Sequence, residues 1–293
     1  MILNGTIIKG IGGFYYVAVK KDIYECKARG KFRIDDIMPV VGDRVAIEVL
    51  PDEDYIGSIV KIYPRENLLI RPTVSNVDQA IIVFSIQQPD PNFYLLDRFL
   101  LLVEEQNLPV YICFNKIDLQ DENMYIELRQ HYEEIGYKVI LTSTLMEEGL
   151  ATLEQVMVGK TTVLAGPSGV GKSSLINQLE PKLNLKTGEI SAKLRRGKHT
   201  TRHVELLPLK IGGYVVDTPG FTSLHLDHLQ QEDIGYYFKE FRPYLPFCKF
   251  NHCSHIHEPS CGVKAALEQN KISVQRYNNY QMIFQEIQQQ KRW

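Results

Sequence analysis

The sequence lacks any stretch of apolar residues long enough to cross a lipid bilayer. Its longest strongly apolar run, residues 80–86, falls well short of the roughly 18 residues that a spanning helix needs. The first twenty residues show no basic segment followed by a long apolar one, and neither end carries a lipidation motif. We therefore expect no secretory leader and no membrane partner, and we expect a cytoplasmic protein.

Cysteine is also scarce. The chain has five cysteines, an odd number, and three of them lie between residues 248 and 261. This distribution argues against the disulfide framework of a small secreted protein and favours metal binding in a reducing compartment. Cys26 and Cys113 fall in predicted strands, where we expect unreactive core thiols.

A strong charge of one sign is missing as well. Lysine and arginine number 33 and aspartate and glutamate 35, so the net charge is 33 − 35 = −2. Bulk charge therefore does not predict a polyanion-binding protein, and any nucleic-acid contact has to come from a local patch. One candidate patch combines Tyr24 and Phe32 with a cluster of basic residues, namely Lys20, Lys21, Lys27, Arg29, Lys31 and Arg33.

The first seventy residues have the pattern of a small all-β domain. Short β-prone runs at residues 6–8, 14–19, 45–49 and 58–63 alternate with turns rich in Gly, Asp and Pro. About five such strands predict a small closed barrel. An SH3-like barrel with no ligand is the alternative that composition leaves open.

From residue 78 the pattern changes to alternating strands and helices. The near-continuous apolar run at 79–86 is typical of a strand that is covered on both faces. The alternation predicts a mostly parallel sheet with helices on both faces. Expected strands are 110–114, 138–141, 161–165, 204–209 and 214–217, and expected helices are 94–106, 121–134, 150–156, 174–179, 264–269 and 273–289. Residues 184–203 have weak periodicity and predict a mobile loop.

A phosphate-binding loop follows the predicted strand 161–165. Residues 166–173 match G-x-x-x-x-G-K-S and lead into a predicted helix, which is the context that this motif requires. Backbone N–H groups of such a loop surround the β-phosphate, Lys172 reaches the β- and γ-phosphates, and the Ser173 hydroxyl binds Mg²⁺. The predicted contacts are Gly166, Pro167, Ser168, Gly169, Val170, Gly171, Lys172, Ser173 and Ser174.

A guanine-recognition motif precedes that loop. Asn115, Lys116, Ile117 and Asp118 form N-K-x-D directly after the predicted strand 110–114. The Asp118 carboxylate can accept hydrogen bonds from N1–H and the 2-amino group of guanine, and adenine has neither donor there. The segment Leu141-Thr142-Ser143-Thr144, after the next strand, fits the backbone loop that contacts guanine O6, with Ser143 and Thr144 as the predicted contacts. Together with a phosphate loop, this motif predicts GTP rather than ATP as the ligand.

The sequence Asp217-Thr218-Pro219-Gly220 follows another apolar strand. We expect Asp217 to hold Mg²⁺ through a water molecule, and the Gly220 N–H to detect the γ-phosphate. The guanine motif thus comes before the phosphate loop, whereas an ordinary Ras-like domain has the opposite order. This order is a circular permutation, which is feasible because the termini of a domain tend to lie close together.

Four residues near the C-terminus have the spacing of a metal site. Cys248, Cys253, His255 and Cys261 offer three thiolates and one imidazole, a closed set suited to tetrahedral structural Zn²⁺. His252 and His257 lie nearby, and we exclude them because the Cys₃His set already fills four positions.

These motifs together resemble a known family, the circularly permuted, ribosome-small-subunit-dependent GTPases of bacteria. The resemblance covers essentially the whole chain, including Gly197-Lys198-His199-Thr200-Thr201 and the cysteine cluster, in which the family pattern falls on His255. It implies an OB-type barrel, a permuted α/β GTPase domain and a small helical zinc-binding domain, which we place at residues 1–70, 71–221 and 222–293. It also implies late maturation of the small (30S) ribosomal subunit, contact with its rRNA, and Zn²⁺ and Mg²⁺ as ions. We expect a monomer.

The glutamine that orients the attacking water in Ras-type enzymes is absent from its usual position. Ras-type enzymes orient the attacking water with a Gln just after D-x-x-G, and Phe221 stands at that position here. His199 is the candidate within the chain, with an RNA-contacting or solvated loop histidine as the alternative. Thr200 or Thr201 would bind Mg²⁺, and we favour Thr201. Arg195, Arg196 and Lys198 could stabilise charge, bind RNA or only be solvated.

Two functions of different classes remain open. One is a GTPase that the small ribosomal subunit stimulates, with Lys172, His199 and Thr201 in catalytic roles. The other is a GTP-regulated RNA-binding module in which hydrolysis is incidental. A kinase is disfavoured, because the guanine motif is intact and no phospho-acceptor domain is evident.

Overall fold

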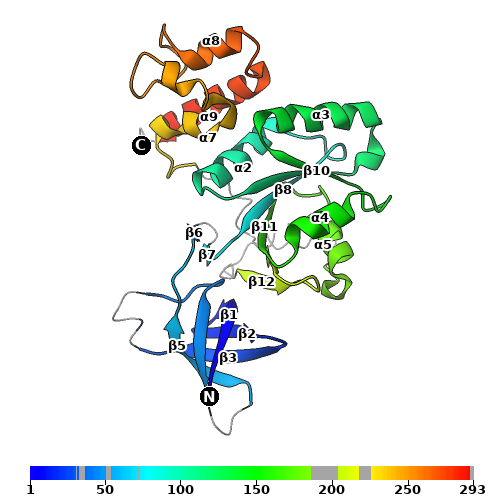
Figure 1. Cartoon of the computed structure of the whole chain (residues 1–293), viewed down its shortest axis with the longest axis vertical. Helices are drawn as coiled ribbons and strands as arrows, with labels where there is room; N and C mark the ends of the chain where they lie inside the picture. Colours follow the sequence, from blue (N-terminus) through cyan, green and yellow to red (C-terminus); the bar gives the residue numbers. More distant parts are fainter. Residues whose placement is uncertain are drawn as a thin grey trace. The chain divides into compact units, whose positions relative to one another are not determined.

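The computed structural model describes residues 1–30, 32, 37–50, 54–70, 73–185, 204–217 and 226–290. The chain divides into two compact units, each built from two separate stretches of sequence (Figure 1). Unit 1 comprises Met1–Ile81 and Gly149–Thr222, and unit 2 comprises Ile82–Glu148 and Ser223–Trp293. The division at residues 1–70, 71–221 and 222–293 stays a prediction.

Unit 1 begins with a five-stranded closed barrel. Its strand order is β1-β2-β3-β5-β4, and β4 pairs back onto β1 to close it. Strands β3 and β5 pair in parallel, while the other barrel pairs are antiparallel. Fully buried aliphatic residues, among them Ile7, Val17 and Ile47, fill the interior. The strands are β1 (Ile2–Ile11), β2 (Phe14–Val19), β3 (Asp22–Ala28), β4 (Arg44–Val49) and β5 (Ile56–Ile62). The predicted OB-type barrel is confirmed.

The second part of unit 1 is one half of an α/β sheet. Strand β11 (Thr161–Ala165) pairs in parallel with β13 (Tyr214–Asp217), and β12 (Glu205–Pro208) is antiparallel to β13. Helices α4 (Leu150–Met157) and α5 (Lys172–Leu179) belong to this half, followed by the short 3₁₀ helix η2 (Pro181–Leu183). The pairing of β1 with β12, Lys9 opposite Glu205, joins the barrel to this sheet.

Strand β8 (Gln79–Ser85) begins in unit 1 and ends in unit 2, and every residue of it is buried. In unit 2 the sheet continues with β9 (Val110–Asn115) and β10 (Lys138–Thr142), which are parallel. Helix α2 (Phe93–Glu105) packs on β9, and α3 (Glu122–Ile135) packs on β10. The alternating apolar pattern after residue 78 therefore produces the predicted α/β sheet.

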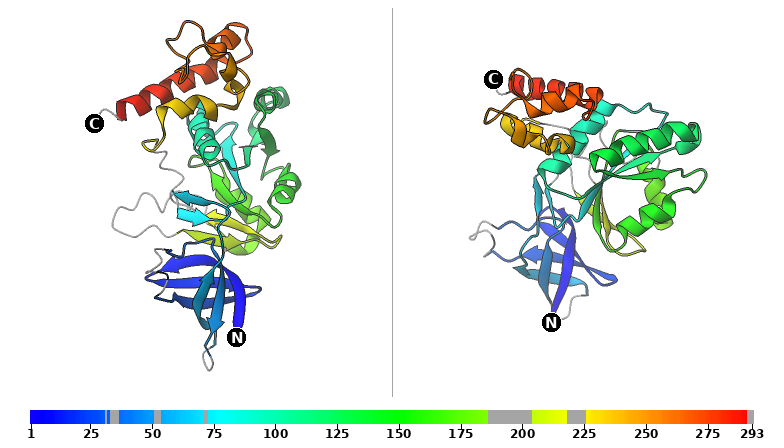
Figure 2. Two further views of the ribbon diagram at one scale, coloured as in Figure 1. Left: turned by 60° about the vertical axis from the view of Figure 1, so that its left-hand side comes forward. Right: turned by 45° about the horizontal axis from the view of Figure 1, so that its top comes forward.

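Unit 2 ends in a small helical module, which Figure 2 shows from two sides with α9 as its longest helix. The module contains α7 (Ile234–Tyr237), α8 (Gly262–Glu268) and α9 (Val274–Gln290), with 3₁₀ turns η3 (Gln231–Asp233), η4 (Lys239–Phe241) and η5 (Leu245–Phe247). A buried aromatic cluster, including Phe238, Phe241 and Tyr280, forms its core. The predicted helices at 264–269 and 273–289 correspond to α8 and α9.

A buried ion cluster attaches this module to α2. The Arg276 guanidinium on α9 donates to Asp97 on α2 and to Glu240 on η4, and the Glu240 Oε1 contact is 2.6 Å. Asn279 adds a 2.6 Å hydrogen bond to Asp97. Coulombic attraction to Asp97 and Glu240 outweighs the desolvation of Arg276 and raises its pKa well above the ordinary value. The helical module is thereby fixed to α2 at one defined position.

Among the helices of the described residues, none is long and apolar enough to cross a membrane.

Candidate nucleotide and metal sites

The phosphate loop occupies the turn between β11 and α5 in unit 1. Gly166, Gly169 and Gly171 have φ angles of 136°, 84° and 98°, a region in which side chains are strained. Phosphate cradles are built from successive backbone N–H groups that converge on an anion, and glycines adopt the required conformations without strain. The spacing of glycines in the sequence therefore matches what the backbone needs at each position.

Lys172 begins α5 and is buried. Its Nζ atom donates to the carbonyl oxygens of Gly166 at 2.7 Å and Pro167 at 2.6 Å, so the ammonium group lies inside the loop. Burial lowers the pKa of Lys172 to about 8. Ser173 is also buried next to it, and Ser174 is half-buried. The loop thus holds a cation where a phosphate group would bind.

The guanine-recognition motif lies at the carboxyl end of β9 in unit 2. Asn115 is the last residue of β9 and is buried, with its Oδ1 atom accepting a 3.0 Å hydrogen bond from Thr142 Oγ1. The Thr142 hydroxyl lies 3.3 Å from Cys113 Sγ. Burial raises the pKa of the Cys113 thiol to about 12, so this thiol stays protonated. Thr142 and Cys113 thereby fix the orientation of the Asn115 carboxamide.

Asp118 and Ser143 face each other across this end of the sheet. Lys116 adopts the left-handed conformation, with φ 63°, and its Nζ atom donates to the Gln88 carbonyl. Asp118 then lies in the short helix η1 (Ile117–Leu119), where its Oδ1 atom accepts a hydrogen bond from the Ser143 hydroxyl. Ser143 is itself held by paired backbone hydrogen bonds with Glu148 of 3.0 and 3.1 Å. Thr144 follows and is half-buried.

Several predicted switch residues fall outside the described part of the chain. These are Arg195, Arg196, Lys198, His199, Thr200, Thr201, Gly220 and Phe221. Asp217 is the last residue of β13, as expected from the apolar residues before it, and its side chain is not described. The predicted roles of all of these residues in magnesium binding and hydrolysis therefore stay predictions.

The structure brings Cys248, Cys253, His255 and Cys261 together in unit 2. Their ligand atoms all lie within 4.8 Å of one another. Cys248 Sγ lies 3.8 Å from Cys261 Sγ, and His255 Nδ1 lies 3.5 Å and 3.4 Å from these two sulfurs. A tetrahedral ion with bonds of about 2.3 Å to sulfur and about 2.0 Å to nitrogen separates two sulfurs by about 3.8 Å, and sulfur from nitrogen by about 3.5 Å. The atoms of Cys248, His255 and Cys261 have this spacing, and Cys253 Sγ lies within 4.8 Å of all three, so the set is suited to such an ion.

The surroundings of the cluster explain how it is assembled. On α9, the Tyr277 hydroxyl donates to the His255 carbonyl at 2.6 Å, and the Tyr280 hydroxyl donates to the Ser254 carbonyl at 2.7 Å. A Cβ atom at Gly235 would lie 2.8 Å from His255 Nε2, so only glycine leaves room for this imidazole. The ligand loop is therefore shaped by residues that lie well outside it in the sequence.

Burial shifts the pKa values of three ligand groups in this cluster. Burial raises the pKa of Cys253 to about 12 and also raises that of Cys261, while burial lowers the pKa of His255. Buried groups in these states are neutral, and a divalent cation would convert the thiols to thiolates. His252 and His257 are exposed and do not join the ligand set found among the described residues, which agrees with their exclusion.

Sequence reasoning missed the groups that hold the sites in place. Thr142 was expected in the guanine-contacting loop, but its hydrogen bond to Asn115 was not predicted. Gly235, Tyr277 and Tyr280 had no visible signal, since nothing in their local sequence points to a histidine in another loop.

Comparison with known proteins identifies the family of this chain. Residues 62–227 match the model of the RsgA GTPase family, and residues 4–59 match that of the RsgA N-terminal domain. This chain belongs to the RsgA GTPase family. The resemblance drawn from the motifs is thus confirmed, and so is its class as a GTP hydrolase.

The similarity extends over the full length of curated relatives and solved structures. The protein named small ribosomal subunit biogenesis GTPase RsgA in Alkaliphilus metalliredigens is 53% identical to this chain, with 99% of each chain covered. The protein of the same name in Agathobacter rectalis is 49% identical, with 99% of this chain and 100% of the other covered. YjeQ of Thermotoga maritima is 37% identical, with TM-score 0.84 and 98% and 99% coverage. YloQ, described as a circularly permuted GTPase, is 39% identical, with TM-score 0.81 and 99% and 96% coverage. The predicted permuted fold is thereby confirmed.

Proposed function

We propose that this chain hydrolyses GTP in response to the small (30S) ribosomal subunit and acts in late maturation of that subunit through contact with its rRNA. The similarity to small ribosomal subunit biogenesis GTPases over 99% of the chain is the observation that carries this proposal. The chain acts in the cytoplasm as a monomer, with the basic residues of the segment 20–33 as one source of RNA contacts. Two of these residues, Lys31 and Arg33, lie outside the described part of the chain.

One GTP molecule uses both nucleotide motifs. Asp118 reads the guanine base, while Asn115, Lys116 and Ile117 shape its site, and Ser143 and Thr144 supply the loop beside the base. Gly166–Ser174 hold the phosphates, and Lys172 leaves its two carbonyl partners to bind them. Ser173 and Thr201 bind Mg²⁺, which neutralises phosphate charge, and Asp217 and Gly220 contact the ion's water and the γ-phosphate.

Water activation is assigned to His199, because Phe221 has no group that could orient a water molecule. Replacing His199 by Ala should keep GTP affinity and lower the subunit-stimulated rate by about 10²-fold, the usual effect of losing a positioning or general-base group.

The Cys248, Cys253, His255 and Cys261 cluster holds one structural Zn²⁺. Three thiolates and one imidazole are the ligands that zinc prefers, and four protein ligands leave no open position for catalysis. The ion stabilises the helical module rather than taking part in hydrolysis.

Steady-state phosphate release at increasing concentrations of purified small subunits tests this proposal against the alternative of a GTP-regulated RNA-binding module. We expect the rate of phosphate release to increase to saturation with small subunits and to stay unchanged with large subunits. The alternative predicts that GTP changes the affinity for the subunit while the rate of phosphate release stays constant.

The role of Asp118 in base recognition has its own test. Asp118→Asn should lower the affinity for GTP and shift the preference toward xanthosine triphosphate, whose 2-oxo group accepts rather than donates. Unchanged GTP affinity in this variant would remove Asp118 from base recognition.

A further inference from the structure

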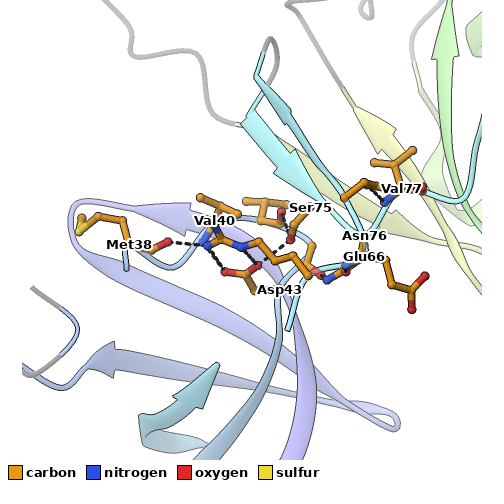
Figure 3. A network of polar contacts seen from close by, with 11 residues as sticks. Met38, Val40, Asp43, Glu66, Ser75, Asn76 and Val77 are labelled. Carbon is orange, nitrogen blue, oxygen red and sulfur yellow. Dashed lines mark hydrogen bonds and ion pairs between the residues drawn. The ribbon is translucent and has the colours of Figure 1, made fainter. Parts of the chain in front are cut away.

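A buried carboxylate holds the barrel to the following strands of unit 1. Asp43 lies just before β4 and is fully buried. Its two oxygens accept four hydrogen bonds: Val40 N–H at 2.8 Å, Arg65 Nε at 2.7 Å, Arg65 Nη2 at 2.9 Å and Ser75 Oγ at 2.7 Å. Figure 3 shows Asp43 between Val40 and Ser75. We call Asp43, Arg65 and Ser75 the barrel joint.

The backbone makes the same connection. Hairpin strands β6 (Leu68–Ile70) and β7 (Thr73–Ser75) follow the barrel, and the Ser75 N–H donates to the Val41 carbonyl at 2.9 Å. Asn76 Nδ2 donates to the Gly42 carbonyl at 2.9 Å. Gly42 has φ 93°, and a Cβ atom there would lie 2.1 Å from the Ser75 carbonyl oxygen. Only glycine allows the two segments to approach this closely.

On the barrel side, the joint is anchored in β1. Gly42 N–H donates to the Ile7 carbonyl at 2.8 Å, and Ile7 N–H donates to the Asp43 carbonyl at 2.9 Å. Strand β1 also meets β12 through an ion pair of 3.0 Å between Lys9 and Glu205. A displacement of the barrel would therefore act on the Asp43 loop directly.

On the nucleotide side, the joint reaches the strand that carries the phosphate loop. Three residues after Ser75, Asp78 N–H donates to the Thr161 carbonyl at 2.9 Å, and Thr161 N–H donates back to Asp78 Oδ2 at 2.6 Å. Gln79 Nε2 donates to Thr162 Oγ1 at 3.0 Å. Thr161 and Thr162 begin β11, which ends directly before Gly166. The chain segment from Ser75 to Asp78, the hydrogen bonds of Asp78 with Thr161, and the length of β11 thus connect the joint to the phosphate loop.

We infer that Asp43 is a positioning residue for subunit-stimulated hydrolysis, because it fixes the orientation of the barrel relative to the phosphate-loop strand. The inference rests on the proposed function, in which the barrel contributes to subunit binding. The Asp43 side chain is fully buried and that of Arg65 is 23% exposed. Removing a partner from a buried charge is costly, so the joint favours the arrangement in which Asp43 keeps its donors. The barrel joint therefore transmits the position of a docked barrel to the GTP site.

The test compares Asp43→Asn with Glu66→Gln in the full-length protein. A carboxamide has one acceptor oxygen, so the Asp43→Asn substitution would leave donors of the barrel joint unpaired without changing the size of the side chain. Glu66 forms an exposed 2.7 Å pair with Arg44 in the same region, and its replacement changes the net charge by the same amount. Single-turnover GTP hydrolysis is measured for each variant, alone and with saturating small subunits, together with thermal unfolding.

We expect Asp43→Asn to keep its basal rate and to lose about tenfold or more of its rate on saturating subunits, since small misplacements of reacting groups are costly. Glu66→Gln should match the wild type in its basal rate and in its rate on saturating subunits. Ser75→Ala removes only one of the donors to Asp43, and we expect it to lower the stimulated rate to a smaller extent. It serves as the test variant if Asp43→Asn fails to fold. The contrary result is that Asp43→Asn and Ser75→Ala unfold at a lower temperature but keep the wild-type ratio of stimulated to basal rate. The barrel joint would then have only a structural role. Absence of stimulation in the wild type would instead contradict the proposed function.

Discussion

The phosphate loop and the Cys₃His cluster both gather polar atoms around a small volume, but different parts of the chain hold them in place. In the phosphate loop, the backbone itself does so, through three glycines with positive φ within six residues. In the cluster, the ligand loop depends on Gly235 and on hydroxyl groups of α9. The first site is defined by local sequence, and the second by tertiary packing.

The two sites also differ in how ready they are for a ligand. The ligand atoms of Cys248, His255 and Cys261 already have the spacing of a tetrahedral site, and Cys253 lies beside them. Lys172, in contrast, is bonded to the carbonyl oxygens of its own loop and has to exchange these partners for phosphate. We infer that the metal site is part of the folded structure, whereas the nucleotide site responds to its ligand.

The largest expected effect is on the cluster. Cys253→Ser removes one of four zinc ligands, and the binding energy of a structural zinc is folding energy of its module. Bound zinc should fall from one ion per chain to nearly none, and the cooperative unfolding of the helical module should be lost. Metal analysis and thermal unfolding measure this. Cys26→Ser, which replaces another buried thiol, should keep the ion; equal metal content in the two variants would remove the cluster from zinc binding.

Lys172→Ala tests the phosphate loop. Removal of the cation that reaches the β- and γ-phosphates should lower the rate of GTP hydrolysis by about 10²- to 10³-fold, as for other groups that stabilise developing charge. The cluster should stay intact, so the zinc content and unfolding temperature are expected to match the wild type. Exposed Lys182 on η2 provides the control, and a similar loss in Lys182→Ala would mean that general charge, not the loop, matters.

Gly235→Ala tests whether tertiary packing places the histidine ligand. The new Cβ would lie 2.8 Å from His255 Nε2 and 2.9 Å from Cδ2, so the ring has to move. We expect zinc affinity, measured by competition with a chelator, to fall about 10- to 100-fold, as for other changes around metal ligands. Gly30→Ala, where a Cβ meets nothing within 4 Å, is the matched control. Unchanged zinc affinity in Gly235→Ala would show that the ligand loop holds its own shape.

The smallest effect concerns pH. Burial lowers the pKa of Lys172 to about 8 in the nucleotide-free protein. The ammonium form attracts phosphate, so GTP affinity should be highest below pH 8 and fall as Lys172 loses its proton, by about fivefold or more between pH 7.5 and 9. In Lys172→Arg the guanidinium stays charged, and titration of GTP binding across this range should show no such slope. The same slope in both proteins would assign the pH dependence to another group.

These sites show why sequence prediction reached some features and not others. The phosphate loop, Asn115–Asp118 and the four metal ligands were predicted because each motif is short and its chemistry fixes the spacing. The boundaries of β11 and of α9 followed from hydrophobic pattern. The contacts of Gly235 and Asp43, and the hydrogen bond from Thr142 to Asn115, were missed because they join segments that are distant in sequence. Short motifs can therefore be predicted from sequence more readily than the groups that position them.

The central claim is that hydrolysis of GTP by this chain depends on the small ribosomal subunit. The most direct measurement is single-turnover hydrolysis of GTP by the full-length protein, alone and with saturating small or large subunits. We expect slow hydrolysis by the protein alone and with large subunits, and an increase of at least about 10-fold with small subunits, as for partner-assisted GTPases. Equal rates in all three conditions would contradict the account and favour a GTP-regulated RNA-binding module.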